Sequence, residues 1–253
     1  MLKNILKVIL GFNLVSLQKL FSSSISSFIL SCKNAFTASH VSDTKKLLTI
    51  PKVSLEDVLG KEQTVILNIG KKETGALPYN QAVALISVLV KEQPKIALEI
   101  GTFLGHTTKL MAQNIPDLKI HTVDLPENFD DKKDNSILEK DDFHLIHTRK
   151  VGREFLGTPF EKQITQHFSD TVSFDFKKAN GATFFFIDGS HTYDYCKNDS
   201  EKCFELCSGQ GVFIWHDCDF EHGGVVDFII EWRKLGRNIV RIEGTPLAYL
   251  KTN

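Results

Sequence analysis

The sequence predicts a doubly wound α/β fold, with a mostly parallel sheet of seven strands and an N-terminal helical extension. Along residues 80–253, short apolar runs bounded by Gly and Pro alternate with segments of helical periodicity. Strands that alternate with helices in this way form a parallel sheet covered on both faces. Polar residues directly follow several of the apolar runs, and in such sheets ligands bind beyond the carboxyl ends of the strands.

The individual elements follow from the same patterns. We expect strands at residues 95–100, 119–124, 163–169, 182–187, 211–216, 238–243 and 246–251. We expect helices at residues 80–92, 105–114, 192–207 and 224–235. The acid-rich residues 126–142 read as a solvated loop.

Composition limits the classes of protein to consider. The chain has 253 residues, and its 30 Lys and Arg nearly balance 31 Asp and Glu, for a net charge of −1. Proteins that bind the nucleic-acid backbone carry a basic excess, so no nucleic-acid partner is expected. The five cysteines are an odd number without a C-x-x-C pair, which favours a reducing compartment and therefore the cytoplasm. No apolar run approaches the ~20 residues of a membrane-spanning helix.

Residues 1–42 differ from the rest because they contain no acidic residue and spread their apolar residues over a wide helical face. Three interpretations stay open for this amphipathic arm. It is an interfacial membrane helix making contact through residues 1–30, a processed targeting peptide, or a helix packed on its own domain or on a second subunit, as in a homodimer. Residues 43–79 then read as a connecting segment with little regular structure, and residues 80–253 as the functional domain.

The first candidate site is the glycine turn in the stretch EIGTFLG at residues 99–105. Gly101 ends a predicted strand and Gly105 opens a predicted helix, so a ligand could approach the backbone and the N–H groups of the helix N-terminus. The alternative is a tight strand-to-helix turn without a ligand. Phe103 stands where the dinucleotide fingerprint G-x-G-x-x-G has its middle glycine, so this fingerprint is absent.

Two acids follow the next two predicted strands. Asp124 lies about twenty residues beyond the glycine turn, where a carboxylate can accept the ribose hydroxyls of a nucleoside; alternatively it caps a helix or turn. Asp170 could face an adenine edge or cap the next segment.

The last two central strands end in further polar residues. Asp188 and His191 follow one strand, and His216 and Asp217 end the next. Carboxylates and an imidazole at neighbouring strand ends could hold a divalent cation through Asp188, His216 and Asp217, or they could simply bond the loop backbone. His191 is the best candidate for a general base because imidazole titrates near neutrality; alternatively it bonds Asp188 or Asp194 at a helix N-terminus.

Together these motifs resemble those of a class I S-adenosylmethionine-dependent methyltransferase. EIGTFLG is similar to the E-I-G-x-F-x-G motif of the cation-dependent O-methyltransferases of the caffeoyl-CoA and catechol type. The stretch from Phe184 to Asp219 resembles a bacterial methyltransferase group with D-G-x-H-x-Y and W-H-D motifs. The likeness runs from about residue 80 to residue 253 and implies a Rossmann-like methyltransferase fold.

The resemblance also implies roles for single residues. The methionine part of the cofactor would be surrounded by residues of the glycine turn, namely Glu99, Gly101, Thr102, Gly105 and Thr107. Asp124 would hold the ribose and Asp170 would lie near the adenine. Asp188 stands where the cation-dependent families have a metal ligand for Mg²⁺ or another divalent cation. His191 replaces their lysine base, and the pair His216-Asp217 replaces an Asp-Asn pair.

The reaction expected from the resemblance moves a methyl group from S-adenosylmethionine to a hydroxyl oxygen of a small molecule or sugar, with His191 as base. Three alternatives stay open. A nicotinamide-dependent oxidoreductase is disfavoured by Phe103. A non-catalytic cofactor-binding or membrane-docking protein could keep the same fold. Asp188, His216 and Asp217 could also serve a metal-dependent hydroxylase-like or hydrolytic reaction.

Overall fold

The computed structural model describes residues 44–67, 76–127, 129 and 149–252. The chain divides into two compact units, residues 1–45 and 46–253, and the second unit contains the sheet and the helices around it. The predicted arm at residues 1–42 and most of the acidic segment at residues 126–142 lie outside the described residues. Within the described part, no helix is long and apolar enough to cross a membrane.

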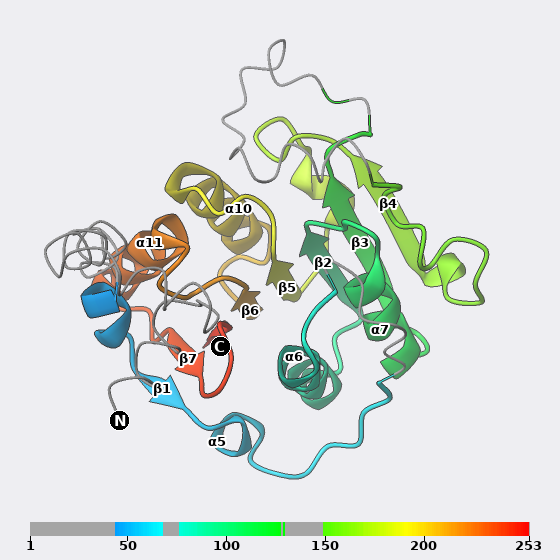
Figure 1. The fold of residues 1–253 in the computed structure, drawn as a ribbon. Helices are drawn as coiled ribbons and strands as arrows, with labels where there is room; N and C mark the ends of the chain where they lie inside the picture. The colour runs from blue at the N-terminus through cyan, green and yellow to red at the C-terminus, as the bar shows by residue number, and fades with distance from the viewer. Residues whose placement is uncertain (1–43, 68–75, 128, 130–148, 253) are drawn as a thin grey trace, which may run out of the picture. The chain divides into compact units, whose positions relative to one another are not determined.

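A single sheet of eight strands forms the centre of this unit, in the order β1-β7-β8-β6-β5-β2-β3-β4 (Figure 1). β8 runs antiparallel to β6 and β7, and all other neighbouring strands are parallel. The predicted doubly wound, mostly parallel sheet is therefore confirmed. The strands are β1 Lys52–Val53, β2 Ile96–Ile100, β3 Lys119–Asp124, β4 Ile164–Phe168, β5 Phe184–Ile187, β6 Val212–Trp215, β7 Val240–Ile242 and β8 Ala248–Lys251.

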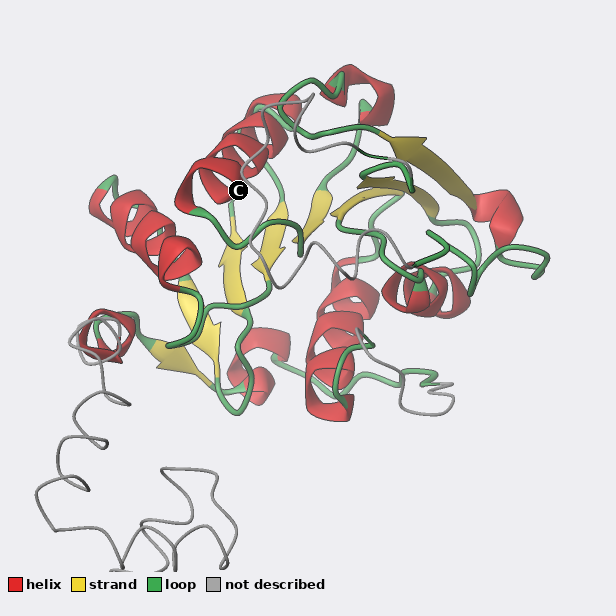
Figure 2. Cartoon of the chain, turned by 45° about the horizontal axis from the view of Figure 1, so that its top comes forward, coloured by secondary structure: helices red, strands yellow, loops and turns green. Residues whose placement is uncertain are grey.

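Helices cover both faces of the sheet (Figures 1 and 2). On one face α5 and α6 pack beside α7, and on the other α10 packs beside α11. The α-helices are α5 Leu55–Leu59, α6 Tyr79–Glu92, α7 His106–Asn114, α10 Tyr193–Leu206 and α11 Gly223–Lys234; the 3-10 helices are η1 Glu161–Gln163 and η2 Phe176–Ala179. The four helices predicted beyond residue 80 are all present, with ends that differ from the prediction by no more than about one residue.

The segment at residues 43–79 contains more structure than its sequence indicates. β1 adds an eighth strand to the predicted seven by pairing with the edge strand β7, where the backbone N–H of Arg241 donates to the carbonyl of Pro51 at 2.8 Å. α5 follows directly, and its first turn is capped by the Ser54 hydroxyl, which accepts from the N–H of Asp57 at 3.0 Å. A strand of two residues and a helix of five are too short to show a periodic pattern, so the sequence predicts neither of them.

The core lies in two layers, one on each face of the sheet. Successive side chains of a strand point to opposite faces, so Phe184 and Phe186 pack with α6 and α7, whereas Phe185 and Ile187 pack with α10 and α11. All four are nearly inaccessible to solvent. The apolar run of β5 is thus explained by burial on both faces, as expected for a central parallel strand.

The centre of the sheet positions the candidate site. β2 pairs with β3 on one side and with β5 on the other. After β2 the chain first adds β3 and β4 on one side, and it then returns to add β5 and β6 on the other side. Such a reversal of strand order opens a crevice at the carboxyl ends of the strands. Most of the predicted functional residues end or directly follow β2, β3, β4, β5 and β6, so they lie at this edge.

Candidate active site

A cavity of about 240 Å³ lies at the carboxyl ends of β2, β3 and β5. It contains five of the predicted site residues. These are Gly101, Asp124, Asp170, Asp188 and His191. The remaining predicted residues, Glu99, Thr102, Gly105, Thr107, His216 and Asp217, are not in its lining.

Gly101 is required by the approach of two strand ends. Its φ is +93°, and a Cβ atom at this position would lie 1.9 Å from the carbonyl oxygen of Asp188. The neighbouring N–H groups close the contact, because the N–H of Asp188 donates to the carbonyl of Ile100 at 2.8 Å and that of Gly101 donates to the carbonyl of Val123 at 2.9 Å. Only glycine fits here, and it brings the end of β5 against the end of β2.

Glu99 is buried behind the glycine turn. Its Oε2 accepts hydrogen bonds from the hydroxyls of Thr108 in α7 and Thr122 in β3, the latter at 2.6 Å. The hydroxyl of Thr122 lies 2.6 Å from that of Thr102, which continues the network to the turn. Burial raises the pKa of Glu99 to about 8, so its carboxyl group is protonated at neutral pH. Glu99 and Thr102 therefore join β2, β3 and the turn.

Asp124 ends β3 at the wall of the cavity. Its Oδ2 accepts from the N–H of Phe103 at 2.6 Å, and its Oδ1 accepts from the N–H of Leu125 at 2.7 Å. The guanidinium of Arg149 also donates to Oδ1. Burial raises the pKa of Asp124 above its ordinary value although these donors lower it. The carboxylate is thus held between β3 and the glycine turn.

Arg149 is a cavity residue that the motifs in the sequence do not include. Its side chain is only 4% exposed and forms an ion pair with Asp124. It follows Asp124 by 25 residues and belongs to no strand or helix. No local pattern in the sequence marks such a partner.

Asp170 caps a turn, which is one of its two predicted roles, and it also lines the cavity. Its Oδ1 accepts from the N–H of Val172 at 2.9 Å, which caps a turn, and its Oδ2 accepts from the hydroxyl of Tyr195 at 2.9 Å at the cavity wall. The nearby Asp199, which the motifs also do not include, is buried in α10, and burial raises its pKa to about 7.

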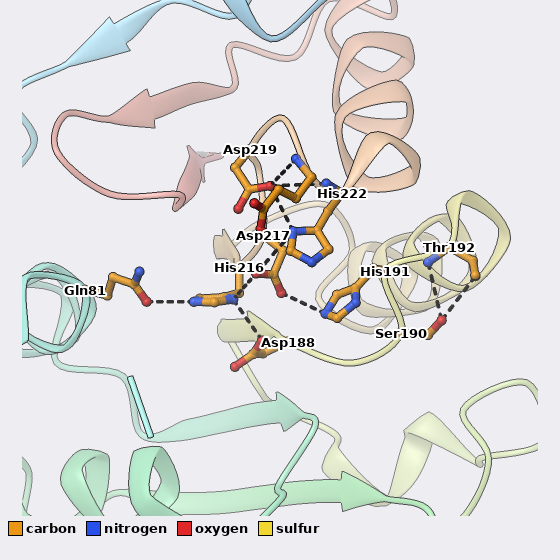
Figure 3. A network of polar contacts seen from close by, with 10 residues as sticks. Gln81, Asp188, Ser190, His191, Thr192, His216, Asp217, Asp219 and His222 are labelled. Carbon is orange, nitrogen blue, oxygen red and sulfur yellow. Dashed lines mark hydrogen bonds and ion pairs between the residues drawn. The ribbon is translucent and has the colours of Figure 1, made fainter. Parts of the chain in front are cut away.

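Beside the cavity, polar groups from the ends of β5 and β6 converge (Figure 3). His216 Nδ1 lies 3.2 Å from Asp188 Oδ1 and 2.8 Å from Asp217 Oδ1, while its Nε2 lies 2.8 Å from Gln81 Oε1 on α6. Burial alone would lower the pKa of His216, but the two carboxylates outweigh it and raise the pKa to about 9. Burial also raises the pKa of Asp188 to about 7.

Asp217 is the centre of this cluster. Its φ is +57°, a backbone conformation that few non-glycine residues adopt. Its Oδ2 lies 2.9 Å from His191 Nε2, and its Oδ1 lies 3.6 Å from His222 Nδ1. Although burial opposes ionisation, the hydrogen bonds of His191 and His216 hold the pKa of Asp217 well below its usual range. Asp217 is therefore ionised and shared by three imidazoles.

The arrangement offers two overlapping sets of cation ligands among the described residues. Asp188, His216 and Asp217 have ligand atoms within 4.8 Å of one another, and so do His191, Asp217 and His222. The first set consists of the three predicted metal ligands, which the fold brings together. The prediction missed His222, Gln81 and Asp219, whose Oδ1 lies 2.9 Å from His222 Nδ1. The stretch HDCDFEH at residues 216–222 carried a signal for His222 and Asp219.

Residues 98–218 match the family model described as a methyltransferase domain. Among solved structures, cofactor-bound Rv0187 from MTB has a TM-score of 0.51 at 12% identity, covering 90% of this chain and 97% of that one. The O-methyltransferase from Bacillus cereus in complex with SAH has a TM-score of 0.49 at 13% identity, covering 71% and 84%. SAH-bound methyltransferase PaMTH1 of Podospora anserina has a TM-score of 0.47 at 12% identity, covering 96% and 97%.

The sequence matches none of the curated proteins with which it was compared. The match at residues 98–218 runs from β2 through Cys218, so it includes the glycine turn, Asp124 and both strand ends of the cluster. Residues 98–218 thus match a methyltransferase domain, and they contain the candidate site except for Gln81, Asp219 and His222.

The protonated Glu99 leads to a prediction about stability. Its pKa is about 8 when folded and 4.5 ordinarily, so the folded state binds the proton more tightly and loses stability as pH rises between these values. Glu99→Gln keeps the acceptor for both threonine hydroxyls but cannot ionise. From pH 5 to pH 8, the unfolding free energy of the unchanged protein should fall relative to that of this variant by at least ~1.4 kcal/mol, the value of one pKa unit.

Urea unfolding at pH 5, 6.5 and 8 measures this difference. Glu205→Gln is the matched control because the side chain of Glu205 is 68% exposed, and its difference from the unchanged protein should not vary with pH. A constant difference for Glu99→Gln over the same range would show that Glu99 is ionised in the folded protein.

Proposed function

We propose that this methyltransferase domain transfers a methyl group from S-adenosylmethionine to a hydroxyl oxygen of a small molecule or sugar. The observation that carries the proposal is that the candidate cofactor residues and the candidate base lie at the same edge of the sheet. Asp124, the proposed acceptor for a nucleoside, lines the same cavity as Asp188 and His191. A methyl donor and a hydroxylated acceptor need such an arrangement, with a cofactor site next to a proton acceptor.

The described residues fit the cofactor. The cavity lies against the backbone of Gly101, and the carboxylates of Asp124 and Asp170, which also line it, would accept hydrogen bonds from a ribose and an adenine. We assign the other predicted cofactor residues, Glu99, Thr102, Gly105 and Thr107, to the glycine turn that shapes the methionine end. S-adenosylmethionine supplies an electrophilic methyl group, so the protein has to align the acceptor and remove its proton.

His191 is the proposed base. It lines the cavity, and its Nε2 lies 2.9 Å from Asp217 Oδ2. A neutral imidazole that donates its Nε2–H to this carboxylate has Nδ1 as its basic nitrogen. A carboxylate that orients an imidazole and stabilises its protonated form is a common way to make histidine an effective base. His191 would take the hydroxyl proton, and Asp217 would stabilise the resulting positive charge.

The set Asp188, His216 and Asp217 fits a divalent cation. If the Nε2–H of His216 donates to Gln81, its Nδ1 faces two carboxylate oxygens and needs a proton or a cation there. Two carboxylates and one imidazole suit Mg²⁺ or Mn²⁺. Such a cation would supply a positive charge that binds an acceptor oxygen and lowers its pKa.

Two further expectations from the sequence stay predictions. Membrane contact through residues 1–30 and pairing with a second subunit both depend on the arm, which lies outside the described residues. Neither is needed for the proposed chemistry.

Binding of S-adenosylhomocysteine tests the proposed function. Calorimetry on the full chain should show binding of this product with Mg²⁺ present and also in EDTA, because the proposed cofactor contacts do not include the cation. NAD is the control ligand and should not bind. Binding of NAD without binding of S-adenosylhomocysteine would favour an oxidoreductase and contradict the proposal.

Replacement of the base gives a second test. His191→Ala should lower turnover of a methyl acceptor by about 10²–10⁴-fold, the usual contribution of a general base. Its affinity for S-adenosylhomocysteine should stay within about twofold, because the proposed cofactor contacts lie on other residues. His121→Ala, a histidine on β3 that does not line the cavity, is the control. Turnover at the level of the unchanged protein would exclude His191 as the base.

Binding of the cation can be measured without a methyl acceptor. Mn²⁺ should bind the full chain with one ion per chain at the strongest site, measured by electron paramagnetic resonance. Asp188→Asn should weaken this binding at least about tenfold, as expected for loss of a ligand. Asp194→Asn alters an exposed acid at the start of α10 and should change nothing. Equal Mn²⁺ affinity in both variants would place the cation elsewhere or nowhere.

A further inference from the structure

We infer that Arg149 is a positioning residue for the cofactor, which holds the charge and the orientation of Asp124 so that one acceptor position of this carboxylate stays open to a ribose hydroxyl. The inference rests on the proposed function and deepens it, because it assigns a role at the cofactor end of the cavity to a residue outside all the motifs. Arg149 lies in no strand or helix and reaches Asp124 across 25 residues of chain.

Most acceptor positions of Asp124 are already occupied. An ionised carboxylate has about four, two on each oxygen. On Oδ1 both are used, by the N–H of Leu125 at 2.7 Å and by Nη2 of Arg149. On Oδ2 one is used, by the N–H of Phe103 at 2.6 Å. Among the described residues, one position on Oδ2 therefore has no donor, and Arg149 determines which oxygen the ribose would meet.

Stability does not explain the presence of Arg149. Its side chain is 4% exposed and that of Asp124 is 11% exposed, so the ion pair is buried. Its Nε and Nη1 have no hydrogen-bond partner within the part of the chain that the structure describes. Buried donors without partners are unfavourable, and buried ion pairs often stabilise a fold no more than apolar residues would. The guanidinium of Arg149 is better explained by its effect on the charge and the orientation of Asp124.

The surroundings of Asp124 are rich in carboxyl groups. Glu99 lies behind it in β2, and the cavity wall also carries Asp170, Asp188 and Asp199 with a single imidazole, that of His191. Arg149 is the cation next to Asp124 among the cavity residues. Burial already raises the pKa of Asp124 with Arg149 in place, so removal of the guanidinium would raise it further. A protonated Asp124 would lose acceptor strength for the ribose.

The experiment measures the affinity for S-adenosylhomocysteine at pH 6, 7.5 and 9 by calorimetry. Arg149→Leu and Arg149→Gln remove the charge, Arg149→Lys keeps it, and Lys150→Ala is the control at the exposed neighbouring cation. Glu99, Asp188 and Asp199 titrate in the same range, but every variant contains them. The ratio of each variant's Kd to that of the unchanged protein therefore isolates the effect at residue 149.

We expect both uncharged variants to bind at least about tenfold more weakly than the unchanged protein at pH 6, a factor that corresponds to one pKa unit. The ratio should fall toward pH 9, because a higher pH favours the ionised form of Asp124. Arg149→Lys and Lys150→Ala should show a ratio that does not vary with pH. Near-ultraviolet circular dichroism of the buried Trp215 and Trp232 reports whether each variant is folded.

Three results would overturn the inference. Unchanged affinity of the uncharged variants at every pH would show that Arg149 has no role in binding. An equal loss at every pH would show that Arg149 does not act by keeping Asp124 ionised, since only the ionisation of Asp124 makes the loss depend on pH. If the unchanged protein binds no S-adenosylhomocysteine at any pH, the proposed function itself fails, and the role of Arg149 fails with it.

Discussion

The contact between the ends of β2 and β5 is the constraint on which the rest of the site depends. The carbonyl oxygen of Asp188 occupies the space in which any side chain at Gly101 would have to lie. This contact joins the two halves of the sheet where its strand order reverses, so the cavity opens at that point. It also brings the strand end that is followed by Asp188 and His191 beside the glycine turn that holds Asp124.

Burial then determines how the polar groups at this edge are used. A charge that leaves water needs a partner of opposite charge or has to be neutralised by a proton. Glu99 is neutralised by a proton, as its raised pKa indicates, whereas Asp124 is paired with Arg149. Asp217 is kept ionised by His191 and His216. Carboxyl groups within one small region thus have different protonation states, which is what a site that both binds a nucleoside and accepts a proton requires.

The two ends of the cavity are built differently for physical reasons. At the proposed cofactor end, Asp124 is held by two backbone N–H groups and one guanidinium, so its position is set by β3 and the glycine turn. At the proposed acceptor end, the carboxylates of Asp188 and Asp217 each lie within 3.2 Å of an imidazole. A carboxylate with a fixed position suits a cofactor that binds in the same way in each catalytic cycle. Groups that exchange protons or a cation suit the end where the acceptor loses a proton.

The sequence by itself determined the fold class and the strand ends that carry polar residues, because hydrophobic periodicity is a local property and strand-end positions follow from it. Asp188, His216 and Asp217 were predicted to converge for this reason, and they do. Only the tertiary structure decided which groups meet them: Gln81 from α6 reaches His216, Arg149 reaches Asp124, and His222 reaches Asp217. These partners are set by the paths of loops and the packing of helices on the sheet, and such long-range contacts leave no periodic trace in the sequence.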